Sequence, residues 1–135
     1  MICIINKMLL PYFTFLATYF VLDMLWINFT SQYHKSAIEG VQKAPLKIDM
    51  FSGTLYYLII SFLIIYALTQ YTKSRNDWFI LGFVIALTMF FTFDITNKTV
   101  FKDYPYWYAG MDIIGGVSSI MLSLLVTWII TSKKN

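Results

Sequence analysis

Three aspartates lie inside stretches of the chain that are otherwise strongly apolar: Asp23, Asp94 and Asp112. A carboxylate in the middle of a membrane-spanning helix costs about 2.5–3.5 kcal/mol on insertion scales, so it is rare there and marks a candidate functional site. Carboxylates at such depth carry protons or hold cations. If the apolar stretches cross a membrane four times, all three acids fall near the same side of it.

Polar and aromatic neighbours of these acids complete a candidate proton or cation site. They are Tyr19, Trp26, Thr96, Asn97 and Lys98. Tyr19 and Trp26 share a helix face with Asp23, because the three residues are spaced i, i+4 and i+7. Lys98 follows Asp94 by four residues, which is the favourable order for an acid–lysine pair on a helix. The spacing therefore allows an ion pair between them.

A series of small residues follows Asp112. Gly115, Ser119 and Ser123 are four residues apart, and Gly116 stands beside the first of them. Small residues at this spacing let transmembrane helices approach each other closely. We therefore expect this face to pack against another helix and to draw Asp112 inward with it.

Four apolar blocks must position these residues. The chain is 59% hydrophobic and 13% charged, against about 25% charged residues in soluble domains. The blocks predict helices at about residues 8–30, 50–70, 78–97 and 107–131, each long enough to cross a hydrocarbon core of about 30 Å. Lipid offers the backbone no hydrogen-bond partners, so helices are expected. The sequence predicts one all-α transmembrane domain over residues 1–135, an up-down-up-down four-helix bundle.

Two features concern the ends of the blocks. The long connection over residues 31–49 fits a short amphipathic helix on the membrane surface, and it fits a loop equally well. Aromatic residues gather where block ends should meet lipid headgroups, as an aromatic belt does. They are Tyr71, Trp78, Tyr104, Tyr106, Trp107 and Tyr108.

The orientation of a multi-pass membrane protein follows from its loop charges. Here the two sides carry five Lys and Arg residues each. The charge density of the short second connection favours both termini in the cytoplasm. The basic residues lie in short segments between apolar blocks, which suits lipid headgroups better than nucleic acid.

Cofactor chemistry finds little support in the composition. Cys3 is the only cysteine and His34 the only histidine, so no ordinary zinc site can form and no cofactor is expected. No nucleophile–base pair or phosphate loop suggests a catalytic residue. An enzyme is therefore not favoured.

Three segments resemble an uncharacterised family of small four-helix membrane proteins, known as a domain of unknown function. Residues 22–26 match its L-D-x-x-W segment. Residues 93–97 resemble its Y-D-x-T-N segment, with Phe93 in place of Tyr, and residues 111–116 resemble its D-x-x-W-G segment, with Ile114 in place of Trp. The resemblance implies a four-helix membrane protein and brings no established activity.

Three functions remain open. The first is a proton- or cation-coupled transporter or channel component that uses the aspartates, expected to be a homodimer because four helices enclose little space. The second is a structural or accessory subunit in which the aspartates only join helices, bound laterally through the face of Gly115. The third is an intramembrane enzyme that holds a divalent metal at Asp23, Asp94 and Asp112.

Overall fold

The computed structural model describes the backbone of residues 2–132 and the side chains of residues 7–132, so Cys3, Lys133 and Lys134 lie outside the described side chains. Within this range the chain forms five helices and no strand. They are α1 (Ile2–Phe29), α2 (Ser31–Gln42), α3 (Met50–Tyr71), α4 (Arg75–Val100) and α5 (Tyr106–Ser132). All except α2 are long and apolar enough to cross a membrane. The prediction of an all-α membrane bundle is confirmed.

The start of α4 differs from the prediction for a local reason. The helix begins at Arg75 rather than near residue 78, because Ser74 and Asp77 form a capping box. The Ser74 side chain accepts from the Asp77 N–H at 3.1 Å, and the Asp77 carboxylate accepts from the Ser74 N–H at 3.1 Å. Each bond satisfies a backbone donor that a helix start otherwise leaves free. The three residues before Trp78 are therefore helical.

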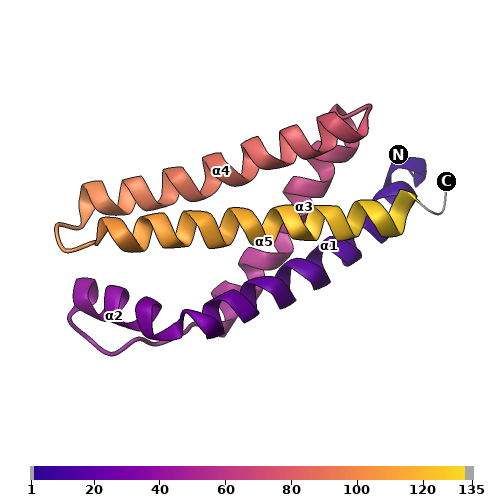
Figure 1. Ribbon diagram of the computed structural model, residues 1–135. Helices are drawn as coiled ribbons and strands as arrows, with labels where there is room; N and C mark the ends of the chain where they lie inside the picture. Colours follow the sequence, from indigo (N-terminus) through magenta and orange to yellow (C-terminus); the bar gives the residue numbers. More distant parts are fainter. Residues whose placement is uncertain (1, 133–135) are drawn as a thin grey trace.

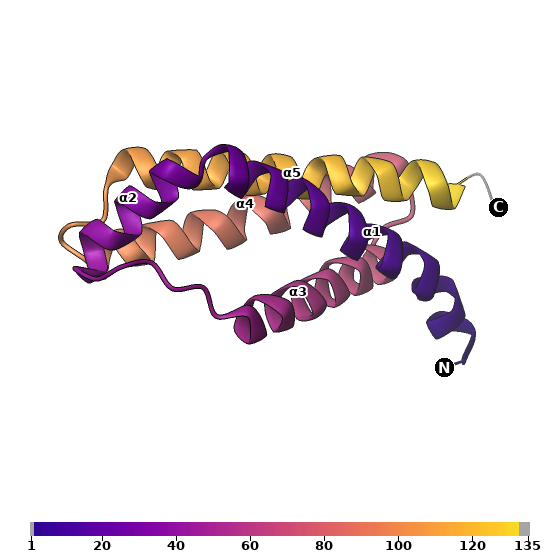
Figure 2. The same ribbon diagram turned by 90° about the horizontal axis from the view of Figure 1, so that it is seen from below.

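The long connection contains both a helix and a loop. After a single turn residue at Thr30, α2 continues from α1 with a bend (Figures 1 and 2). Its Ala37 is buried against Tyr108 and Ala109 of α5 and against Tyr104, which precedes that helix. At Lys43 the backbone turns left-handed, with φ 52°, and the chain runs extended to α3. The helix alternative thus holds for residues 31–42, and the loop alternative holds for the rest.

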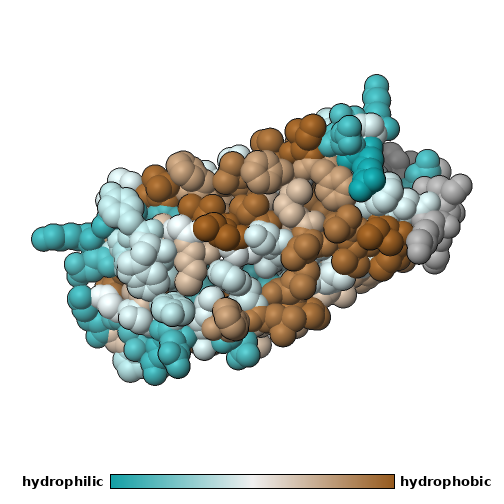
Figure 3. Space-filling view, in the orientation of Figure 1, coloured by the Kyte–Doolittle hydropathy of each residue, from teal (hydrophilic) through white to brown (hydrophobic). Residues whose placement is uncertain are grey.

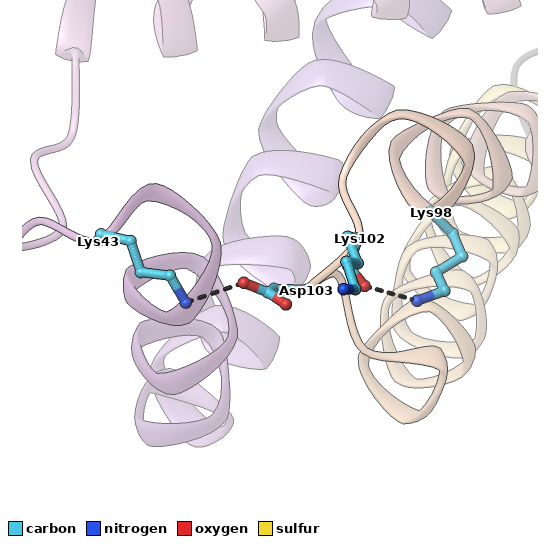
Figure 4. Close-up of polar contacts among 4 residues, drawn as sticks. All are labelled: Lys43, Lys98, Lys102 and Asp103. Carbon is cyan, nitrogen blue, oxygen red and sulfur yellow. Dashed lines mark hydrogen bonds and ion pairs between the residues drawn. The ribbon is translucent and has the colours of Figure 1, made fainter.

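An ion pair joins the end of α2 to the connection between α4 and α5. The Lys43 Nζ lies 3.0 Å from the Asp103 carboxylate (Figure 4). Both side chains are exposed, so we assign the pair no more than about 1 kcal/mol.

Helix α5 lies at the centre of the packing. It contacts α1 and α4 along much of its length, whereas α3 packs on α1 and less extensively on α4. Figure 2 shows that α3 diverges from α5 toward its own start, on the side of α2. The opposite half of the bundle is closed by a core whose fully buried side chains include Phe15, Ile64, Ile65, Ile120 and Leu124.

The outer surface is that of a membrane protein. Large apolar side chains on all four long helices are exposed, Leu25, Phe62, Phe91 and Leu122 among them. Figure 3 shows apolar side chains gathered between hydrophilic ends of the molecule. A surface of this kind is stable in lipid and not in water, so the chain is a multi-pass membrane protein.

The small residues of α5 lie inside the bundle. A Cβ on Gly115 would meet the indole of Trp26 from α1, and a Cβ on Gly116 would meet the ring of Phe90 from α4. Ser119 and Ser123, farther along the same face, are buried. The absence of side chains at the two glycines therefore lets α1 and α4 approach α5 closely.

This packing predicts that Gly115→Ala destabilises the protein by about 1–3 kcal/mol, because the added methyl displaces the Trp26 indole. Unfolding in mixed detergent micelles measures the change. Gly110→Ala is the matched control, since a Cβ there meets nothing within 4 Å. Equal stability of the two variants would contradict the packing.

Candidate functional site

A cavity of about 580 Å³ lies in the half of the bundle that carries α2. Residues of all five helices line it, and so does the segment between α2 and α3. Most of its wall is apolar or aromatic. The acids and the histidine in the wall are Asp23, Asp49, Asp112 and His34.

Asp23 comes from α1 and is almost buried, with 9% of its surface exposed. The Tyr57 hydroxyl of α3 donates to its carboxylate at 2.5 Å. The ring of Tyr57 packs against Tyr19, and the Tyr19 hydroxyl lies 2.9 Å from that of Tyr56. Three tyrosine hydroxyl groups thus lie close to Asp23, where α1 meets α3 at the cavity.

Asp112 of α5 differs from the other two intramembrane acids. It is half-buried and lines the same cavity as Asp23. Each of the other two receives a tyrosine hydroxyl, but no side chain within residues 7–132 forms a hydrogen bond or ion pair with Asp112. Its carboxylate is therefore free to interact with whatever enters the cavity.

Asp94 of α4 is fully buried and does not belong to the cavity wall. The Tyr104 hydroxyl donates to its Oδ1 at 2.5 Å, and its Oδ2 has no partner within the described residues. Burial, together with the hydrogen bond to Asp94, raises the pKa of Tyr104, so this hydroxyl stays protonated and donates. The Tyr104 ring packs edge-on against Tyr108, which does line the cavity.

His34 joins α2 to this arrangement. Its Nδ1 lies 2.9 Å from the Tyr108 hydroxyl, and the side chain is only 8% exposed. Its Nε2 is buried without a partner within the described residues, although the residue lines the cavity. Sequence reasoning set His34 aside because one histidine cannot form a zinc site, and it therefore missed this position.

The burial of His34 predicts a pH dependence of stability. Burial lowers the pKa of His34 below its usual 6.5. The unfolded chain then binds a proton more readily than the folded protein, so the contribution of His34 is complete above pH 6.5 and decreases as the pH falls through that value. Unfolding at pH 7.5 and pH 5 measures the loss. His34→Gln should lose less stability on acidification, and an equal loss would contradict this account.

The aromatic belt was predicted correctly only in part. Tyr71, Tyr106 and Trp107 are more than half exposed, as residues at the headgroups should be. Tyr104 and Tyr108 are each 6% exposed and point into the protein, which corrects their assignment to the belt. Asp112 follows Tyr108 by four residues, so the two side chains share one helix face. This spacing was available in the sequence as a sign that Tyr108 points inward with Asp112, and the belt assignment did not use it.

The remaining candidates separate into two groups. Tyr19 is fully buried, and Trp26 lines the cavity, while its buried indole N–H has no partner in the described part of the chain. Thr96 is exposed and Asn97 is half-buried, and neither lines the cavity.

Lys98 does not pair with Asp94. It donates to the Lys102 carbonyl at 3.1 Å (Figure 4) and its Nζ lies 4.7 Å from the centre of the Tyr106 ring. Asp94 faces the core, whereas a lysine at the end of the helix keeps its ammonium group in water.

A shared metal site does not form from these acids. Among the described residues, no three His, Cys, Asp or Glu side chains are grouped closely enough to hold a metal ion. Asp23 and Asp94 each accept one tyrosine hydroxyl instead, from Tyr57 and from Tyr104. The metal-dependent alternative therefore has no support in the geometry.

Comparison with known proteins identifies the family and no activity. A family described as "Predicted membrane protein (DUF2177)" matches residues 8–129. No curated protein and no solved structure matches the chain.

Proposed function

We propose, from the premise that the chain belongs to the DUF2177 family of predicted membrane proteins, that it is a small transporter coupled to a proton or a cation. Its binding site is the cavity in the α2 half of the bundle. Asp112 of α5 is the group that takes the cation or the proton, and Asp23 of α1 assists in the same cavity.

The unpaired carboxylate of Asp112 carries this proposal. It shares one cavity with Asp23, and no Lys or Arg side chain stands among the residues that line it. A carboxylate in an apolar environment interacts strongly with a cation or a proton, because water screens neither.

Passage across the membrane requires a route beyond the closed core. The buried face of α5 continues from Asp112 through Ser119, Ser123 and Thr127 toward the other end of the bundle. Ser123 and Thr127 donate to the carbonyls four residues earlier, at 2.6 and 2.7 Å, and their oxygens keep acceptor capacity. We propose that these hydroxyl groups line the route when the half of the bundle that contains the closed core opens.

The oligomeric state and the orientation follow as further proposals. Residues of a single chain already line the cavity, so the proposed function does not require the predicted homodimer. The starts of α1 and α3 lie at opposite ends of the bundle, and α5 ends at the same end at which α1 begins (Figure 1). If the termini face the cytoplasm, the cavity lies in the outer half of the membrane.

A structural role is the second candidate, and two hydrogen bonds favour it. Tyr57 binds Asp23 and Tyr104 binds Asp94, so both acids join neighbouring elements of the bundle. We assign Asp94 this role. Lateral docking through Gly115 and its neighbours has no such support, because α1 and α4 of the same chain cover that face.

Flux through liposomes tests the transport proposal. Purified protein is reconstituted with a pH-sensitive dye inside the vesicles, and gradients of protons and of inorganic or organic cations are imposed. We expect cation-driven movement of protons above that of empty vesicles. A protein that stays folded in the vesicles and moves neither protons nor any cation of the panel would refute transport.

A further inference from the structure

We infer that the cavity binds an amphipathic organic cation, which enters from the bilayer between the start of α3 and the end of α4. This inference rests on the proposed function and names the substrate class for the same site.

The size and wall of the cavity exclude a bare inorganic ion as its natural occupant. At about 580 Å³ the cavity lies in the range of pockets that take drug-sized molecules, about 300–1,000 Å³. Apolar and aromatic side chains such as Phe20, Met89 and Phe90 make up most of the wall. A small hydrated ion would leave this apolar surface facing water, whereas an apolar molecular body covers it.

The charges of the wall select a cation. Asp23 and Asp112 lie inside, and Asp49 stands where the extended segment enters α3. Hydrogen bonds from the Ser52 hydroxyl and from the Phe51 N–H lower the pKa of Asp49, so this carboxyl is ionised. No lysine or arginine in the wall offsets these acids. The aromatic residues Trp26 and Tyr108 also line the cavity, and aromatic rings attract cations that lie over their faces.

The opening toward the lipid follows from the position of α3. Its backbone contacts α1 and α4 but comes near neither α5 nor α2 (Figure 2). Met50 and Gly53 of α3 and Phe93 of α4 all line the cavity. Met50 and Phe93 are also exposed on the outer apolar surface. The cavity therefore reaches the surface that contacts acyl chains, where amphipathic cations concentrate.

Equilibrium binding of tetraphenylphosphonium to the purified full-length protein in lipid nanodiscs tests the inference. Tetraphenylborate, an anion of nearly the same shape, is the matched ligand control. We expect the cation to bind at least about tenfold more tightly than the anion. Asp112→Asn should weaken cation binding at least about tenfold, and Asp103→Asn, which removes a carboxylate outside the cavity, should not.

A pair of glycine variants tests the location. An added Cβ on Gly53 or on Gly110 meets no atom within 4 Å, so both positions have room at the backbone and both variants should fold. Only Gly53 lines the cavity. Gly53→Leu should therefore weaken binding of the phosphonium at least about tenfold, while Gly110→Leu should leave it unchanged.

Two outcomes would overturn the inference. One is equal binding of the cation and the anion, and the other is cation binding that Asp112→Asn and Gly53→Leu leave unchanged. The proposed function fails separately. Phosphonium binding without any flux would refute transport and retain the ligand class, whereas proton or metal-cation flux without phosphonium binding would retain transport and refute the ligand class.

Discussion

Asp112→Asn is expected to abolish cation-coupled flux and to leave the stability of the protein unchanged or slightly higher. Asp112 lines the cavity, and no described side chain pairs with it. Loss of the carboxylate removes a charge–charge interaction in an apolar site, which costs about 2 kcal/mol or more and weakens cation binding roughly 30-fold. No protein hydrogen bond is lost, so folding gains from the removal of an unpaired charge.

Flux in liposomes and unfolding in mixed micelles measure the two effects on the same preparation. Asp103→Asn serves as the control, because it removes one carboxylate from an exposed surface pair. An Asp112→Asn protein that transports like the wild type, or that unfolds about 2 kcal/mol more easily, would assign Asp112 a structural role instead.

Asp94→Ala is expected to have the opposite pattern. Asp94 is fully buried and accepts the Tyr104 hydroxyl at 2.5 Å. Its truncation leaves that hydroxyl without a partner and opens space in the core, so the protein should lose about 1–3 kcal/mol of stability. Flux per folded molecule should persist, because Asp94 does not line the cavity.

Asp94→Asn is the conservative comparison. The amide oxygen can still accept from Tyr104, so most of the stability should return. If Asp94→Asn retains its stability and yet stops flux, then Asp94 handles the proton or cation and the division of roles between the acids is wrong.

The fold could be predicted because the bilayer limits the choices. Runs of about twenty apolar residues in lipid must form helices, and their lengths fix the number of crossings. The small residues of α5 also indicated close packing, which Gly115 and Gly116 show against Trp26 and Phe90. Helix spacing likewise predicted that Tyr19 and Asp23 share one face of α1, and both side chains are buried.

The partners of each acid could not be predicted, because they come from other elements. Tyr57 lies 34 residues from Asp23, and His34 lies 74 residues from Tyr108. Such pairs depend on how far α3 diverges from α5 and on the contact of α2 with α5, and neither is encoded in the periodicity of a single helix. Spacing suggested Lys98 as the partner of Asp94, yet the three-dimensional packing places Tyr104 there.

The relative reactivity of Asp112 and Asp94 toward a hydrophobic carbodiimide, measured by mass spectrometry on the protein in liposomes, tests the account most directly. Asp112 lines an open cavity and has no partner among the side chains of residues 7–132, whereas Asp94 is fully buried beneath Tyr104. We predict that Asp112 is modified at least about tenfold faster than Asp94. Modification of Asp94 at the same rate as Asp112, or faster, would contradict the account.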